Sequence, residues 1–330
     1  MIFIISDKND IQIYYVIYYL KKKGAKYFQF NVSEYPIQIE YTYSYNKLVL
    51  KTYIKINDKY LDCDEINSVW YRKPDLPQLS PVLSSSEKIY AKNECAQHLS
   101  GLYYLLDEKF WMNRIDSMRR ADNKAFALTK AFNLGLTVPK TLITNNSNKA
   151  WSFHKENKGN IIYKTLSDGL LFNRDPNYNQ PFVQGEIYTT HLNQFRESDF
   201  KYVNNCPCLF QEYINKRLEL RIIVVGNEVF AVEIHSQEKE QTKYDYRRTE
   251  LKEITHKVHQ LPQDISEKCK LLVKKLGLSY GAIDMILTPD GEYVFLEINS
   301  NGQYGWLEER TGLKINESIA NSLIHANITY

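Results

Sequence analysis

The sequence is poor in cysteine and has no long apolar run. Its 330 residues include only five cysteines, an odd and scattered set that does not indicate a disulfide framework. No apolar stretch approaches the roughly 20 residues that a membrane-spanning helix needs. The N-terminal MIFIISDKND lacks the basic start and the longer apolar segment of a signal peptide. We therefore expect a cytoplasmic protein with no membrane segment.

An excess of one charge and the common cofactor motifs are also lacking. The 42 basic and 39 acidic side chains are mixed along the chain, which does not indicate a nucleic acid partner. Cys206 and Cys208 have no second Cys or His pair at zinc-ligand spacing, and no HExxH is present. No GxGxxG, HRD or DFG element occurs either. These absences argue against a zinc site, a dinucleotide-binding oxidoreductase and a protein kinase.

The first third of the chain reads as an α/β domain. The apolar run at 2–5 is followed at 10–23 by a segment that ends in Lys-Lys-Lys-Gly, as helices do, and then by a second apolar run at 26–31. Strand, helix and strand in this order predict a parallel unit. We expect the rest of the domain, which ends near residue 115, to contain a hairpin, a strand, a helix and an edge strand at 41–62, 69–72, 85–107 and 110–113.

The remaining chain predicts two further parts, because 330 residues exceed what one core usually supports. Residues 116–210 read as a small mixed lobe, with helices and strands alternating over 116–133, 137–144, 147–157 and 160–165. Residues 211–330 contain two clear hairpins with a helix between them, at 219–234, 280–299 and 264–276. The fold class is therefore mixed α/β, with an antiparallel sheet in the last part.

The sharpest chemical signal lies in the second of these hairpins. Its strand GAIDMIL places Asp284 among apolar neighbours, and its strand YVFLEINSNG places Glu297 and Asn299 two residues apart. Side chains alternate along a strand, so these last two share a face that Asp284 can share across the turn. Two carboxylates and an amide oxygen suit Mg²⁺. Because the flanking residues are apolar, we prefer this interpretation to a hairpin whose polar residues face water.

Two lysines complement such a site. Lys164 ends the buried-looking run Ile-Ile-Tyr-Lys, where an ammonium needs an anion such as an ATP phosphate. A lysine that extends from a strand edge into water explains the pattern equally well. Lys124, early in a predicted helix, could also reach a phosphate, although by itself a solvated helix lysine is the simpler interpretation.

Further candidates lie at the start of the last part. Gln211, Glu212 and Ile214 end a strand in a pattern suited to a linker whose backbone binds the edge of adenine. Glu219 and Arg221 alternate on the next strand, where a carboxylate can accept ribose hydroxyls and a guanidinium can bind phosphate. The alternative is an exposed cross-strand ion pair of little energetic value.

In chain order these residues resemble the ATP-grasp superfamily over residues 115–312. The matching elements are Asn123-Lys124, Lys164, QEYI at 211–214, Glu219-Leu-Arg221, Asp284 and Glu297-x-Asn299. Within that superfamily the chain is most similar to the microviridin-type peptide maturases, the graspetide synthetases, through segments 69–72, 135–145, 230–237, 244–247 and 299–308. Membership of the branch paired with radical-SAM SPASM proteins stays open. Ser300 stands where the family usually has proline, a change that we expect to loosen the turn.

The resemblance implies an ATP-grasp fold with three parts. These are an N-terminal pre-ATP-grasp α/β domain (1–115), a central small lobe (116–210) and a C-terminal lobe with the metal site (211–330). It also implies ATP and Mg²⁺ as cofactors. Their expected ligands are Asp284, Glu297 and Asn299 for the metal, Lys124, Lys164 and Arg221 for phosphates, Gln211, Glu212 and Ile214 for adenine, and Glu219 for ribose.

The implied substrate is a ribosomal precursor peptide with a leader and an acidic core. An Asp or Glu side chain of the peptide would become an acyl phosphate, which a Ser, Thr or Lys side chain would attack to close an ester or amide ring. Arg247 would bind the acidic group and Asp245 would orient it or act as a weak base, although without the resemblance a solvated loop pair is the simpler interpretation. The leader would bind at 170–205, around Phe172, Tyr178 and Phe182, and related enzymes suggest a homodimer.

Two other functions remain open at this point. The first is a different ATP-grasp carboxylate–amine ligase, such as a RimK-like enzyme that extends a protein tail or a small-peptide synthetase. The second is a nucleotide- or peptide-binding module without catalysis, which the presence of all three expected metal ligands disfavours. The sequence does not reveal the precursor peptide, the ring pattern, or whether the bond is an ester or an amide.

Overall fold

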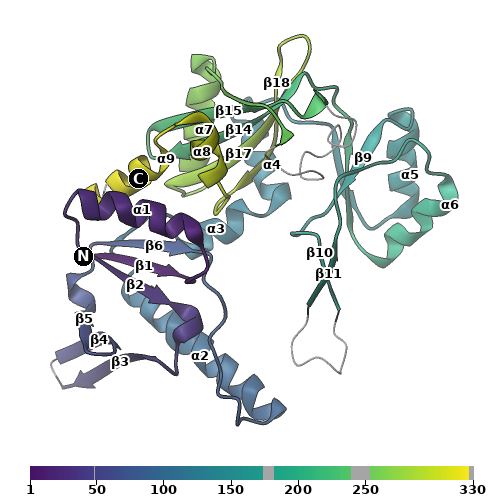
Figure 1. Ribbon diagram of the computed structural model, residues 1–330. Coiled ribbons are helices and arrows are strands. Elements are labelled where there is room, and N and C mark those ends of the chain that lie inside the picture. Colours follow the sequence, from purple (N-terminus) through teal and green to yellow (C-terminus); the bar gives the residue numbers. More distant parts are fainter. Residues whose placement is uncertain (48, 174–181, 239–252, 327–330) are drawn as a thin grey trace.

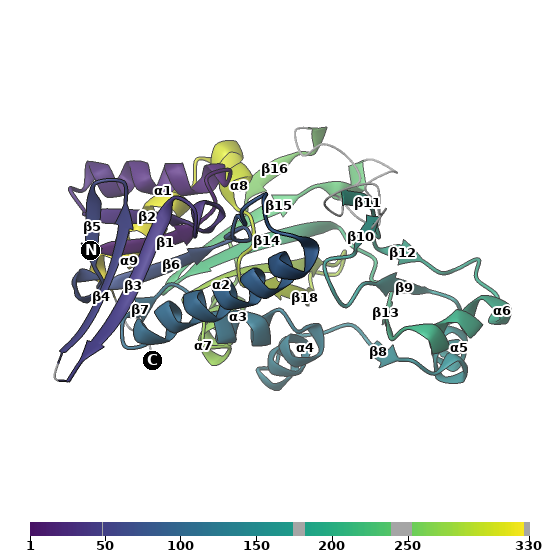
Figure 2. The same ribbon diagram turned by 90° about the horizontal axis from the view of Figure 1, so that it is seen from below.

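The computed structural model describes residues 1–47, 49–173, 182–238 and 253–326. Figures 1 and 2 show a C-terminal sheet in the middle of the molecule, with the N-terminal part on one side and a small lobe on the other. Within the described residues, no helix is both long and apolar enough to cross a membrane.

The N-terminal part is built on a parallel four-stranded sheet of order β2-β1-β6-β7. Its strands are β1 (Ile2–Ser6), β2 (Tyr27–Asn31), β6 (Ser68–Arg72) and β7 (Phe110–Trp111). Alternate side chains of β1 enter separate cores. Ile2 and Ile4 pack with helix α1 (Ile11–Lys22), whereas Phe3 and Ile5 pack with helix α2 (Ser85–Leu105). The predicted parallel α/β unit is therefore confirmed.

The expected hairpin at 41–62 is part of a three-stranded antiparallel sheet instead. The strands are β3 (Ile39–Asn46), β4 (Val49–Ile56) and β5 (Lys59–Asp62). The predicted turn at Asn57-Asp58 is present, and Asn57 has a φ of 52°. The turn after β3 was missed because neither glycine nor proline marks it, although Lys47 there also has a positive φ.

The prediction of one helix over 116–133 is wrong, because the chain breaks at Asp122-Asn123. Helix α3 covers Ile115–Ala121 and helix α4 covers Lys124–Asn133. The Asn123 side chain accepts a hydrogen bond from the Phe126 N–H and so caps α4. Both helices pack against the C-terminal sheet, since α3 and α4 share a core with its strands.

The small lobe contains an antiparallel sheet of order β12-β9-β13-β8. Its strands are β8 (Thr141–Thr144), β9 (Ile161–Lys164), β12 (Thr190–His191) and β13 (Cys208–Glu212), with helices α5 (Ser147–Glu156) and α6 (Glu197–Phe200). Strand β8 starts later than predicted, because Thr137 bridges to the C-terminal sheet at Val294 instead. A separate hairpin of β10 (Leu170–Asn173) and β11 (Phe182–Glu186) projects from the lobe (Figure 1).

The C-terminal sheet has the order β16-β15-β14-β17-β18 and is antiparallel. Its strands are β14 (Leu218–Val225), β15 (Glu228–Ile234), β16 (His256–Val258), β17 (Tyr280–Leu287) and β18 (Tyr293–Asn299). Both predicted hairpins are confirmed. Helices α4 and α7 (Gln263–Lys275) contribute to the core on one face. The other core joins this sheet to α1, α8 (Gly305–Thr311) and α9 (Ile315–His325), which unites it with the N-terminal part.

Arg72, at the end of β6, joins the N-terminal part to the loop that follows β18. The residue is 1% exposed. Its guanidinium donates to Asp10 Oδ2 (3.0 Å) and Gln12 Oε1 (3.0 Å) near the start of α1, and to the carbonyl oxygens of Asn301 (2.7 Å) and Gly302 (3.3 Å). A buried charge with this many partners fixes the loop, because removing it would take a donor away from each of them at once.

We predict that Arg72→Met lowers the free energy of unfolding by about 3–5 kcal/mol, because the largely buried Asp10 carboxylate, 14% exposed, would lose its counterion. Urea unfolding followed by circular dichroism measures this change. Arg119→Met is the matched control, since the Arg119 side chain is 77% exposed and its one ion pair among the described residues is with Asp116 at 3.6 Å. A loss below about 1 kcal/mol for Arg72→Met, as expected for surface changes, would show that the loop is held by other contacts.

Candidate active site

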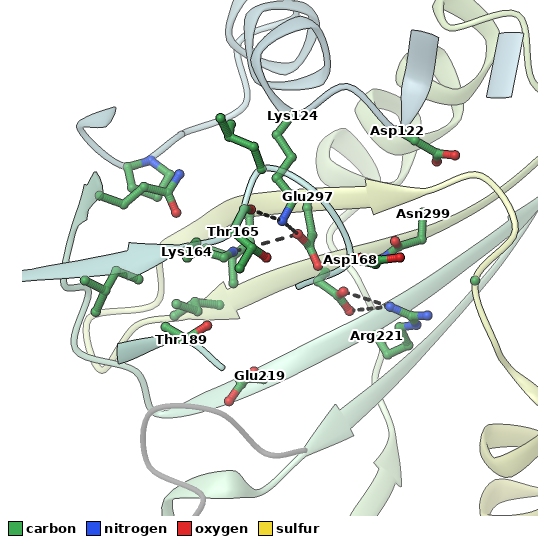
Figure 3. Close-up of a pocket in the computed structure, with 18 of the residues that line it drawn as sticks. Asp122, Lys124, Lys164, Thr165, Asp168, Thr189, Glu219, Arg221, Glu297 and Asn299 are labelled. Carbon is green, nitrogen blue, oxygen red and sulfur yellow. Dashed lines mark hydrogen bonds and ion pairs between the residues drawn. The ribbon is translucent and has the colours of Figure 1, made fainter. Parts of the chain in front are cut away.

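A cavity of about 750 Å³ lies where the small lobe, the C-terminal sheet and the loop after β18 meet. Figure 3 shows the side chains that enter it from these elements. The expected nucleotide and metal residues all line this cavity: Lys124, Lys164, Gln211, Glu212, Ile214, Glu219, Arg221, Asp284, Glu297 and Asn299. Asp245 and Arg247 lie outside the described residues.

The centre of the cavity is an acidic pair on neighbouring strands. Asp284 of β17 is directly opposite Glu297 of β18 in the sheet register, and Asn299 is opposite Ala282. The register shifts next to this pair, from Asp284 opposite Glu297 to Met285 opposite Phe295. Leu296 is thus an extra residue, as in a β-bulge, and both it and Glu297 line the cavity. The bulge brings Glu297 to the same face as Asp284.

Arg221 neutralises one member of the pair. It is opposite Asp284 in the β14–β17 register, and its Nη1 lies 2.8 and 2.7 Å from the two carboxylate oxygens. Burial raises the pKa of Asp284, Arg221 opposes this effect, and the nearby Glu297 raises the pKa further. The two carboxylates therefore form a site that favours bound positive charge.

Two lysines from different elements approach Glu297, the second carboxylate of the acidic pair. Lys124 Nζ, from the first residue of α4, lies 3.5 Å from Glu297 Oε2 and donates to the Thr165 carbonyl oxygen at 2.6 Å. Lys164 Nζ, from the last residue of β9, lies 3.9 Å from the same carboxylate oxygen. Figure 3 shows both ammonium groups directed toward Glu297. The cavity thus joins the small lobe electrostatically to the C-terminal sheet.

This donor set fits Mg²⁺ together with a polyphosphate. Asp284, Glu297 and Asn299 offer hard oxygen atoms on one face, while Lys124, Lys164 and Arg221 supply cations around them. Within the described residues, no group of three or more His, Cys, Asp or Glu side chains is placed to hold a metal. Two carboxylates and one amide leave coordination positions for water and phosphate, which is the usual arrangement for Mg²⁺.

The remaining candidates also line the cavity. Gln211 is buried, and its Nε2 donates to Thr141 Oγ1 at 3.1 Å. The Glu212 carboxylate accepts from the Lys140 backbone N–H at 2.8 Å, so it supports the linker rather than extending freely. Glu219 accepts from Lys216 Nζ at 2.6 Å and from Ser236 Oγ at 2.8 Å.

Sequence reasoning missed several residues of this site. Lys73, Lys216 and the loop 165–168 also line the cavity. Asp122 does so as well, and its carboxylate accepts from the Ser300 backbone N–H (3.1 Å) and Oγ (2.8 Å). These bonds anchor Ser300, the position at which we expected a looser turn. Only the polar run Asp122-Asn123-Lys124 gave a local signal for any of these contacts.

Comparison with known proteins identifies the family. The model of the MvdD pre-ATP grasp domain matches residues 1–119, and that of the RimK-like ATP-grasp domain matches residues 189–323. No curated protein gives a match. Solved structures are similar over nearly the whole chain. Macrocyclase MdnC from Microcystis aeruginosa MRC, bound with precursor peptide MdnA, is 30% identical, with a TM-score of 0.85, and the match covers 99% of this chain and 100% of that one.

Two further structures support the same assignment. A RiPP-associated ATP-grasp ligase from Chryseobacterium gregarium, in complex with ADP and a leader and core peptide, is 29% identical, with a TM-score of 0.88 and coverage of 99% and 97%. Macrocyclase MdnB from Microcystis aeruginosa MRC is 28% identical, with a TM-score of 0.78 and 98% of both chains covered. The ATP-grasp fold is therefore confirmed, and the chain belongs to the family of ATP-grasp peptide ligases of the microviridin, or graspetide, type.

Proposed function

We propose that this ligase uses ATP to activate Asp or Glu side chains of a ribosomal precursor peptide and closes rings with Ser, Thr or Lys side chains. The observation that carries the proposal is the Asp284–Glu297 pair, set among Lys124, Lys164 and Arg221 in one cavity. The full-length similarity to a macrocyclase bound with its precursor supports the peptide as substrate. Ester and amide products are both compatible with this chemistry.

The arrangement of the cavity supports the binding of a nucleotide. Lys124, Lys164 and Arg221 would bind the phosphates, and Asp284, Glu297 and Asn299 would hold Mg²⁺, which shields the phosphate charge when it is bound. Backbone groups of 211–214 would contact adenine, and Glu219 would accept the ribose hydroxyls. The related Chryseobacterium gregarium ligase was solved with ADP, which supports this use of the cavity.

The reaction balances in two steps. A peptide carboxylate oxygen attacks the terminal phosphorus of ATP, the bond to the bridging oxygen breaks, and ADP leaves. The hydroxyl or amine then attacks the acyl carbon, gives up its proton and expels inorganic phosphate. Because the carboxylates and cations already surround the cavity, the protein contributes mainly positioning and charge stabilisation.

Other parts of the proposal concern the peptide and the assembly. Arg247 would bind the acidic group or acyl phosphate, with Asp245 orienting it, and the leader would bind along 170–205. The chain would divide into a pre-ATP-grasp domain (1–115), a small lobe (116–210) and a C-terminal lobe (211–330), and it would work as a homodimer. Light scattering of the purified protein tests the dimer.

We predict that Mg-ATP and the short acidic peptide encoded beside the gene give a product lighter by one water per ring. Glu297→Gln and Asp284→Asn should slow this conversion by about 10²–10³-fold, since each removes a carboxylate that would hold Mg²⁺ against the transferring phosphoryl group. Mass spectrometry of the peptide follows the product. Glu309→Gln, at an exposed position on α8, is the matched control. A gain of amino-acid mass, or rings formed at the normal rate by both variants, would contradict the proposal.

We also predict that Lys164→Met raises the Kd for Mg-ATP by about 10–100-fold, because it removes a charge-assisted contact worth roughly 1.5–3 kcal/mol. Isothermal titration calorimetry without peptide measures this change. Lys149→Met provides the comparison, since Lys149 is an exposed lysine of α5 in the same lobe. Equal affinities for wild type and Lys164→Met would exclude Lys164 from the phosphate site.

A further inference from the structure

The cavity receives one side chain from the N-terminal part of the protein. Among the described residues of 1–119, Lys73 is the single one that lines it. Lys73 follows directly after Arg72, at the carboxyl edge of the parallel sheet. The Arg72 contacts with Asn301 and Gly302 hold this edge against the loop after β18, which also lines the cavity. Lys73 is itself exposed, but it directly follows a residue that a buried network holds in place.

The backbone of Lys73 has an unfavourable conformation. Its φ is 41°, in the left-handed region, and the next residue is Pro74. A residue before proline is normally restricted to extended conformations, and a non-glycine residue at positive φ costs of order 1–3 kcal/mol. Such strain persists where the surrounding structure imposes it and is concentrated at functional sites. The Arg72 network supplies that constraint here and directs the following side chain to the cavity.

Lys73 also lacks a counterion in the described structure. Within the described ranges, no carboxylate lies within 4 Å of its ammonium, and Asp10, the acidic group that acts on it electrostatically, is bound by Arg72. Desolvation and the positive charges of Arg72 and Arg221 lower the pKa of Lys73, while Asp10 raises it. Lys73 is exposed and lines the cavity, and the positive charges of Arg72 and Arg221 that act on it make this wall favourable for a bound anion.

The charges around the cavity indicate which anion this is. Lys124 and Lys164 converge on Glu297, whereas the charged neighbours of Lys73 are Arg72, Asp10 and Arg221. The Arg221 guanidinium donates hydrogen bonds both to Asp284 and to the Gln303 carbonyl oxygen. It therefore lies between the Asp284–Glu297 pair and the loop after β18. An anion bound at Lys73 would thus approach the terminal phosphate of ATP next to Arg221. Lys124 and Lys164 would contact that phosphate from another direction.

We propose that Lys73 binds the acidic side chain of the peptide substrate and holds its carboxylate beside Arg221 for attack on ATP. This inference rests on the proposed macrocyclisation. It assigns a substrate-binding role to the pre-ATP-grasp part of the chain. The carboxylate would lose water on entry, and the ammonium would replace that hydration with a charge-assisted hydrogen bond.

The test compares Lys73→Gln, Lys73→Arg and the matched control Lys59→Gln, an exposed lysine of β5 in the same part of the chain. The Gln and Arg variants keep the unbranched stem at a strained position, so thermal melting should change little. For Lys73→Gln we expect kcat/KM for the peptide to fall by about tenfold or more, as for loss of one charge-assisted hydrogen bond. The Kd for Mg-ATP should stay within about twofold, and Lys73→Arg should recover part of the loss.

The possible outcomes separate this inference from the proposed function. If the wild-type enzyme forms no ring, the proposed function itself fails. If the wild type forms rings and Lys73→Gln has normal kcat/KM, only the role of Lys73 is refuted. A weaker Kd for Mg-ATP with unchanged kcat/KM for the peptide at saturating ATP would assign Lys73 to the nucleotide phosphates, which also overturns the inference.

Discussion

The repulsion between Asp284 and Glu297 is the constraint on which the rest of the site depends. The two carboxylates face each other across neighbouring strands, and the β-bulge at Leu296 brings Glu297 onto that face. Two like charges in this position destabilise the fold unless cations lie near them. The structure provides those cations from three separate elements, through Arg221 on β14, Lys124 on α4 and Lys164 on β9. The acidic pair therefore holds the small lobe to the C-terminal sheet, and exchange of these internal cations for Mg²⁺ and phosphate would couple nucleotide binding to the contact between the lobes.

The loop after β18 has to be fixed for this arrangement to persist. Gly302 has no room for a side chain, since a Cβ there would lie 2.7 Å from Arg221 Nη2 and 2.5 Å from Ala282 Cβ. Asn113 accepts from the backbone N–H groups of Ser279 and Tyr280 and donates to the Ser300 carbonyl oxygen at 2.6 Å. Together with Arg72, these contacts make the N-terminal part a support for the catalytic loop. That role gives a physical reason for the two parts to share one core.

Local signals predicted much of the fold and of the site. The hairpins over 219–234 and 280–299 could be predicted because each depends on residues that are near in sequence. The two-residue period of a strand also correctly placed Glu297 and Asn299 on one face of the sheet. The break between α3 and α4 could not be predicted from the sequence, because the Asp122 side chain bonds to Ser300, which is 178 residues away in the chain. For the same reason neither the Arg221–Asp284 pair nor the contribution of Lys73 followed from spacing. Contacts of this kind depend on how separate elements pack, which no single segment encodes.

When nucleotide binds, Asp284 and Glu297 should exchange their internal cations for Mg²⁺, which Asn299 would help to hold. A crystal structure with Mg-ADP tests it most directly. We expect oxygen atoms of these three residues about 2.0–2.1 Å from the metal, or joined to it by one water, with Lys124, Lys164 and Arg221 turned toward phosphate oxygens. A metal bound elsewhere, with the Arg221–Asp284 ion pair intact and the phosphates away from the lysines, would contradict it.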